Sequence, residues 1–255
     1  MSVAGAALVA VAGFGAGAVN AAAGGGTLLS FPALLAAGVP ALTANITSSV
    51  GLLAGYAGGS VAYRRELVGQ GHRVRVLGAA SVVGGVAGAL LLLVTPARSF
   101  RGVVPYLLLL ACALLLAQPR VGAWVRARRG EAPHAGAKVG LGLAVLVAVL
   151  TVYGSYFGAG LGVVLLAALG IALDDGLQRI NALKGLLSLI VNVAGVAIFL
   201  ASGHVDWGYA AILTVTSYAG AHFGVGVARR VSPTVLRAAV VVLGAAVAAA
   251  LLARS

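Results

Sequence analysis

Apolar residues run through this chain in long blocks, and charged residues occur only in short clusters between them. The first charged side chain is Arg64, so the first 63 residues carry no charge, which is enough for two membrane crossings of about 20 residues each. Blocks of this length predict membrane-spanning helices. Splitting the chain at charge clusters and turn-forming residues gives apolar segments at 3–20, 27–63, 76–95, 102–118, 139–173, 181–202, 207–228 and 235–253.

Two of these segments are too long for a single crossing. The segment 27–63 is interrupted by Gly-Val-Pro at 38–40, and the segment 139–173 is interrupted by the sequence GSYFGAGLG at 154–162. Each is therefore expected to contain a broken or re-entrant helix. Non-helical backbone at membrane depth must be buried in protein or line a polar cavity, because lipid cannot satisfy its N–H and C=O groups. The two breaks are thus the first indication of a functional site.

An internal repeat relates two parts of the chain. A shift of 136 positions carries five glycines, an asparagine and an arginine of the first part onto identical residues of the second. The expected fold is all-α: a polytopic integral membrane protein with two repeated halves of about four transmembrane helices each, and a broken or re-entrant helix in each half. The first membrane repeat would span 1–118, a basic cytoplasmic linker 119–138, and the second membrane repeat 139–255. The matched pairs are Gly24/Gly160, Gly26/Gly162, Asn45/Asn181, Gly59/Gly195, Gly84/Gly220, Gly88/Gly224 and Arg101/Arg237.

The distribution of basic residues predicts an orientation. If each break is re-entrant, each half has four crossings, and the loop 64–75 and the linker 119–138 share one side with nine Lys and Arg between them. The opposite side carries only about four, so the positive-inside rule places the basic loops and both termini in the cytoplasm. If the breaks were full crossings, the comparison of basic residues on the two sides would no longer hold. The two halves would then be inverted relative to one another.

Composition narrows the function classes. Hydrophobic residues make up 61% of the chain and charged residues 9%, which excludes most soluble proteins. The net charge of +12 lies in clusters between apolar runs, where it fits anionic lipid headgroups better than nucleic acid. We therefore expect a multi-pass protein of the cytoplasmic membrane of a prokaryote, with the lipid bilayer and no nucleic acid as partner. The single cysteine, Cys112, offers no disulfide framework or cysteine metal site, and 3–20 is expected to be a retained helix.

The second break predicts an anion site at a helix end. The eleven apolar residues 163–173 rise about 16 Å, half a bilayer, before an acidic turn at 174–176. The N-terminus of this helix, beside Gly160 and Gly162, would then lie near the midplane with unpaired N–H groups and the positive end of the helix dipole. Glycine leaves such amides open to a ligand. The alternative is close helix packing, because Gly154, Gly158 and Gly162 form a GxxxG series. The first half offers a similar helix start at Gly24, Gly25, Gly26 and Thr27.

A polar stripe follows the second break. Asn181, Lys184, Ser188 and Asn192 recur at helical spacing along an otherwise apolar helix. A lysine in the hydrocarbon costs about 2.5 to 3.5 kcal/mol, so Lys184 needs a carboxylate, carbonyls or an anionic ligand. The acidic residues all lie in loops or turns, Asp174 and Asp175 being nearest. Alternatively, Lys184 lies near the helix entrance and extends to the headgroups. The corresponding first-half stripe is Asn45, Thr47, Ser48 and Ser49.

His222 is the only imidazole inside a predicted span, which makes it a candidate proton relay. A histidine that is hydrogen-bonded between helices is the alternative interpretation. The spans contain no Asp or Glu, so a carboxylate proton relay of the usual kind is excluded. Glycines on two other segments are expected to be packing faces without chemistry, namely Gly84, Gly88, Gly220 and Gly224.

Three stretches, 13–45, 153–171 and 181–192, resemble the TauE/SafE sulfite exporter family, and the resemblance covers essentially the whole chain. The string YGSYFGAGLG followed by NALK is the most specific part, and VDW at 205–207 belongs to it as well. Ile46 departs from the family pattern, in which a lysine often follows the asparagine. The resemblance implies a permease for sulfite, sulfonates such as sulfoacetate or toluenesulfonate, or related small organic anions.

The leading hypothesis is a secondary transporter that binds a small anion between two halves and alternates access; a small-anion channel is the alternative. A search for HExxH, paired membrane carboxylates and nucleophile–histidine pairs finds only Ser217 and His222, which are poorly aligned on a helix. We expect no enzyme activity, no catalytic residue, no metal site and no cofactor; a homo-oligomer remains open. The candidate substrate-binding residues are Gly24, Gly25, Gly26, Thr27, Asn45, Ser48, Tyr156, Gly158, Gly160, Gly162, Asn181, Lys184 and Ser188.

Overall fold

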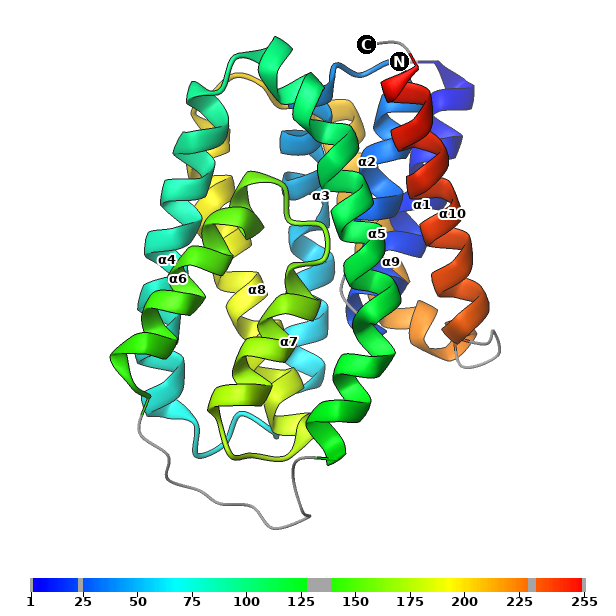
Figure 1. Cartoon of the computed structure of the whole chain (residues 1–255). Coiled ribbons are helices and arrows are strands. Elements are labelled where there is room, and N and C mark those ends of the chain that lie inside the picture. The colour runs from blue at the N-terminus through cyan, green and yellow to red at the C-terminus, as the bar shows by residue number, and fades with distance from the viewer. Residues whose placement is uncertain (1, 23–24, 128–138, 229–232, 254–255) are drawn as a thin grey trace.

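The computed structural model describes residues 2–22, 25–127, 139–228 and 233–253, and these residues form ten helices and no strand. Four helices are long and apolar enough to cross a membrane, so the expected all-α polytopic class is confirmed (Figure 1). The helices are α1 (Val3–Ala22), α2 (Thr27–Ala36), α3 (Ala41–Ala62), α4 (Gly71–Val94), α5 (Ala97–Ala127), α6 (Leu141–Tyr156), α7 (Leu161–Ala172), α8 (Leu177–Leu200), α9 (Trp207–Ala228) and α10 (Pro233–Leu252).

Two helices are short, and each follows a glycine-rich connection, α2 after the α1–α2 connection and α7 after the α6–α7 connection. The helix α2 has 10 residues and α7 has 12, which correspond to about 15 and 18 Å of rise. Gly25 has a φ of 120° before α2, and Gly160 has a φ of 83° at the start of α7. Residues with a side chain rarely adopt these backbone conformations, which explains why glycine is needed where each helix begins.

The pair α1 and α2 forms a helical hairpin that returns to the end where it began. A Cβ added to Gly15 would lie 3.2 Å from the side chain of Leu29, and one added to Gly5 would lie 3.3 Å from the Cβ of Ala37. The start of α2 therefore packs on the second half of α1, and the end of α2 packs near the start of α1.

The pair α6 and α7 makes a second hairpin. A Cβ added to Gly154, near the end of α6, would lie 2.5 Å from the side chain of Leu161 at the start of α7. At the other end of α7, Asp175 forms an ion pair with Arg73 at the start of α4. Because α4 and α6 run in the same direction, α7 also returns toward the end where α6 began (Figure 1).

The parallel packing of α4 on α6 depends on glycine. A Cβ added to Gly84 would strike the carbonyl of Ala148, and one added to Gly88 would strike the carbonyl of Val152. Small residues allow helix backbones to approach this closely. Gly220 of α9 packs in the same way on the carbonyl of Phe14, so the predicted packing role of Gly84, Gly88 and Gly220 is confirmed. Gly224 lies where no side-chain surroundings are described.

Helices α1, α3 and α9 run in one direction, and α4, α6 and α8 run in the opposite direction (Figure 1). The start of α1 meets the start of α9 where Gly5 approaches Tyr209, and the two helices stay in contact as far as Gly17 and Ser217. The helix α5 runs antiparallel to α10, since Gln118 near the end of α5 accepts a hydrogen bond from Arg237 near the start of α10. The helix α5 continues past the expected linker boundary at 118 to Ala127.

The order of helices in α1–α5 matches that in α6–α10. The starts of α3 and α8, of α4 and α9, and of α5 and α10 are each 136 residues apart. Contacts correspond as well, because α1 packs on α9 as α6 packs on α4, and α2 packs on α10 as α7 packs on α5. Helices at corresponding places run in opposite directions (Figure 1). The fourth helix of each set packs on the other set, since α4 contacts α6 and α9 contacts α1.

The two ends of the helix bundle differ in the chain segments they carry. The α3–α4 loop and the end of α5 lie at one end, which agrees with the expected common side of the basic loops (Figure 1). The start of α1 and the end of α10 lie at the opposite end. The prediction that both termini share the side of the basic loops is therefore wrong. The reason is that the α1–α2 hairpin returns to its own end, which leaves a single passage, α3, before the first basic loop.

Candidate substrate pocket

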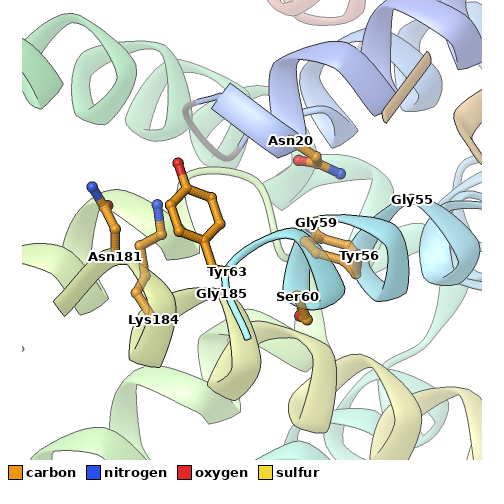
Figure 2. A pocket seen from close by; sticks show the side chains of 9 residues that line it. All are labelled: Asn20, Gly55, Tyr56, Gly59, Ser60, Tyr63, Asn181, Lys184 and Gly185. Atoms are coloured by element: carbon orange, nitrogen blue, oxygen red, sulfur yellow. The ribbon is translucent and has the colours of Figure 1, made fainter. Parts of the chain in front are cut away.

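A pocket open to solvent, with about 410 Å³ of space when its open mouth is included, lies where the end of α1, the second half of α3 and the first half of α8 meet. Three glycines contribute to this space because they present no side chain. The lining residues are Asn20, Gly55, Tyr56, Gly59, Ser60, Tyr63, Asn181, Lys184 and Gly185 (Figure 2). Of the predicted substrate-binding residues, the pocket brings together Asn181 and Lys184.

Lys184 supplies the positive charge of this pocket. Its side chain is half-buried and extends beside Tyr63 (Figure 2). Among the described residues it has neither a carboxylate nor a hydrogen-bond partner. Asp175, one of the two partners considered from the sequence, instead forms ion pairs with Arg73 and Arg179. The Lys184 ammonium is therefore available to a ligand.

Asn20, in the last turn of α1, caps the start of α2. Its Oδ1 accepts hydrogen bonds from the backbone N–H groups of Gly25 at 3.1 Å and Gly26 at 2.7 Å. The Nδ2 of Asn20 is buried and makes no hydrogen bond. The expectation that the first glycine cluster leaves these amides open is thus not met in this conformation, because a side chain occupies them. Gly24 lies outside the described residues.

Tyr56 links the pocket to the start of α2. Its hydroxyl lies close to the polar side chains of Asn20, Thr27 and Asn192. Thr27 is the first residue of α2, and it is buried. Asn20, Tyr56, Ser60 and Tyr63 were not among the residues predicted from the sequence to bind substrate. In the sequence these residues are isolated polar side chains within apolar segments. Their spacing does not indicate that they share one site.

Asn45 and Ser48 lie outside the pocket and hold helices together. Asn45 is fully buried, and its Nδ2 donates a hydrogen bond to the backbone carbonyl of Tyr156 at 2.9 Å. The hydroxyls of Ser48 and Ser30 are 2.6 Å apart, which joins α3 to α2. The Tyr156 ring packs edge-on against Phe100, with centroids 5.8 Å apart. These three predicted residues therefore connect α3 to α2 and to the end of α6.

The glycines of the second break also lie outside the pocket lining. Gly158 has a φ of 79° and Gly160 a φ of 83°, so both require glycine. A Cβ added to Gly160 would lie 3.0 Å from the Leu114 side chain, so this position faces α5. Gly162 is buried in α7. A Cβ on Gly158 would lie 3.9 Å from Thr27 Oγ1, so the α6–α7 connection approaches the start of α2.

Two further candidates lie apart from the pocket space. Ser188 is buried one turn beyond Lys184, and its carbonyl accepts a hydrogen bond from Asn192 at 2.8 Å. His222 is exposed on α9 and stacks on Tyr218 with centroids 6.3 Å apart. The helix α9 contributes no residue to the pocket lining.

A buried ionic cluster fastens the bundle end at which α7 finishes and α8 begins. Asp175 pairs with Arg73 and with Arg179, and Gln70 donates a hydrogen bond to the Arg179 carbonyl at 3.1 Å. Burial raises the pKa of the Asp175 carboxyl, but hydrogen bonds from Arg179, Arg73 and the Gly176 N–H outweigh it and hold the pKa below its usual value. The cluster therefore keeps a carboxylate charged.

Comparison with known proteins agrees with a membrane function. The family model described as sulfite exporter TauE/SafE matches residues 9–251. The probable membrane transporter protein YfcA of Escherichia coli K12 is 27% identical over 238 residues, which cover 93% of this chain and 86% of that protein. The probable membrane transporter protein ORF9 of a Sinorhizobium species is 26% identical over 247 residues, 95% and 90% of the two chains. A Haemophilus influenzae protein with the same description is 26% identical over 232 residues, 91% and 88%. No solved structure matched.

Proposed function

The chain belongs to the TauE/SafE sulfite exporter family of membrane proteins, and from this membership and the pocket we propose a specific transport activity. We propose that the protein is a secondary transporter that moves a small anion, sulfite or an organosulfonate, across the cytoplasmic membrane by alternating access. The observation that carries the proposal is Lys184, a cation without a partner among the described residues, in a pocket whose lining contains no acidic residue.

The chemistry of the pocket favours an oxyanion. Sulfite and sulfonate oxygens accept hydrogen bonds, and charge-assisted bonds from an ammonium are among the strongest available. Asn20 Nδ2 is a buried donor without an acceptor, and Asn181 and Lys184 supply further donors from α8. A buried donor without a partner carries a desolvation cost, which an anionic ligand would remove.

The arrangement of helices supports alternating access. We propose that α1–α5 and α6–α10 are inverted repeats, since corresponding helices start 136 residues apart and run in opposite directions. We further propose that the two hairpins, α1–α2 and α6–α7, are re-entrant in the membrane and that their glycine-rich connections meet near its midplane. Inverted repeats with interrupted helices at corresponding places are typical of secondary transporters.

Counterflow in proteoliposomes tests transport. Vesicles loaded with unlabelled sulfonate should accumulate labelled sulfonate transiently, which a channel cannot do. Competition by sulfite, thiosulfate, sulfoacetate, taurine and acetate would rank the substrate class. Absence of counterflow together with rapid equilibration of the label would indicate a channel and contradict the transporter proposal.

Lys184→Ala tests the site directly. If the ammonium binds the anion, affinity should fall by about 1.5 to 3 kcal/mol, or roughly 10- to 150-fold in Kd, and Lys184→Arg should recover only part. The measurement is ligand-induced thermal stabilisation of the purified protein. Arg120→Ala removes an exposed cation from α5 and should leave affinity unchanged. Equal affinity of wild type and Lys184→Ala would contradict the assigned role.

A further inference from the structure

Each position that lines the pocket has a counterpart 136 residues away, and the two regions differ in exposure. Tyr63, Asn181 and Lys184 are half-buried and face the pocket (Figure 2). Their counterparts Phe199, Asn45 and Ser48 are at most 1% exposed. The structure therefore has one open region and one closed region at corresponding places.

Two glycines at corresponding places have different surroundings on the closed side and the open side. A Cβ added to Gly195 of α8 would strike the hydroxyl of Ser155 near the end of α6. The counterpart of Gly195 is Gly59 of α3, which instead lines the pocket. The closed side is thus sealed where α8 meets α6, and the open side has a cavity where α3 faces α1.

One hydrogen bond across the closed side has an unmade equivalent on the open side. Asn45 donates to the Tyr156 carbonyl at 2.9 Å, which joins α3 to the end of α6. The counterparts of these residues are Asn181 and Asn20. The Asn181 side chain makes no hydrogen bond within the described part of the chain, and Asn20 lies on the opposite side of the pocket (Figure 2).

We propose that Asn45 and Asn181 are alternating latches. The bond from Asn45 to the Tyr156 carbonyl holds one side closed in the present conformation. When the pocket closes, this bond breaks and Asn181 donates the equivalent bond to the backbone carbonyl of Asn20. The inference rests on the proposed alternating-access function, and it names the two contacts whose exchange separates the two states.

Cysteine reporters on the two sides test the latches without any substrate. In a Cys112→Ala background, Tyr63→Cys reports the open side and Phe199→Cys the closed side, and the rate of maleimide modification is measured on purified protein. A buried hydrogen bond biases a two-state equilibrium by about 2- to 10-fold. Asn45→Ala should therefore raise the Phe199→Cys rate by about 2- to 10-fold and lower the Tyr63→Cys rate.

Asn181→Ala should have the opposite effect, lowering the Phe199→Cys rate, because it removes the latch of the other state. Thr151→Val is the matched control, since the Thr151 hydroxyl bonds only to carbonyls of its own helix, Val147 and Ala148; it should change neither rate. General loosening by Asn45→Ala would raise both rates, and that result, or unchanged rates, would overturn the proposal.

Counterflow measured on the same variants separates the two claims. Reporter rates that shift as expected in a protein that moves no anion would leave the latches standing and refute the transport function. Sulfonate counterflow in wild type with reporter rates that do not respond to Asn45→Ala would refute the latches alone.

Discussion

The pocket between α1, α3 and α8 and the corresponding closed region between α6, α8 and α3 have related backbones and different side chains. Lys184 faces the pocket, whereas its counterpart Ser48 is bonded to Ser30. Tyr63 lies at the pocket, whereas its counterpart Phe199 is buried. Among the described residues that line the pocket, Lys184 is the only cation, and its counterpart Ser48 is uncharged, so this charge occurs in one of the two similar sets of helices.

The two ends of the bundle also differ in the interactions that hold them together. At the end near α7 and α8, Asp175 is 4% exposed and binds Arg73. The position 136 residues after Arg73 is Tyr209, whose N–H donates to Asp206 Oδ1 at 3.2 Å, while the Asp206 N–H donates to Thr47 Oγ1 at 3.0 Å. One end is therefore held by a buried ion pair and the other by ordinary hydrogen bonds.

The largest predicted effect is the loss of the buried ion pair. Asp175→Ala leaves Arg73 buried without its partner, and breaking a buried pair in this way costs about 3 to 5 kcal/mol of unfolding free energy. Asp206→Ala, at the other end, removes a helix cap and should cost only about 0.5 to 2 kcal/mol. Thermal and denaturant unfolding in detergent measure both. Equal losses in the two variants would remove the proposed distinction between the ends.

The second break provides an intermediate effect. Gly160→Ala forces a side chain into a φ of 83° and places its Cβ 3.0 Å from Leu114, which should cost about 1 to 3 kcal/mol of unfolding free energy. Gly142→Ala is the matched control, because Gly142 is exposed in α6 with nothing within 4 Å and should be neutral or slightly stabilised. The measurement is the melting temperature of the purified protein. A neutral Gly160→Ala would show that the α7 start tolerates a side chain.

Much of the fold was predictable because hydrophobic blocks and glycine breaks act locally. The Gly-Val-Pro break at 38–40 separates α2 from α3, and the glycines at 154–162 separate α6 from α7. The side of the membrane for each terminus was not predictable in this way. It depends on the α1–α2 hairpin, which is set by tertiary contacts such as Gly15 with Leu29. The packing of α4 on α6 and of α9 on α1 was not predictable either, because no local sequence pattern indicates which helices become neighbours.

The pocket was predictable only where residues form a pattern. Asn181 and Lys184 lie on a stripe with helical spacing, and both line the pocket. Asn20 and Tyr56 are single polar residues in apolar segments, and only the fold brings them beside α8. The role of Asn45 was equally hidden, since its partner is a backbone carbonyl 111 positions away, which no side-chain pattern indicates.

The smallest predicted effect is the response of the ionic end to pH. Hydrogen bonds from Arg179 and Arg73 hold the pKa of Asp175 below its usual value, so the folded protein binds this proton less readily than the unfolded chain does. The stabilisation is therefore fully present above about pH 4, the unfolded value, and is lost as the pH falls through the lower folded value. Asp175→Asn should lack this acid-dependent step, so the stability difference between wild type and variant should be constant between about pH 6 and 8 and narrow below about pH 4. Melting temperatures across this range measure the difference.

A stability difference between wild type and Asp175→Asn that stays constant under acid would mean that the charge of Asp175 does not stabilise this end. The two ends of the bundle would then differ in geometry alone.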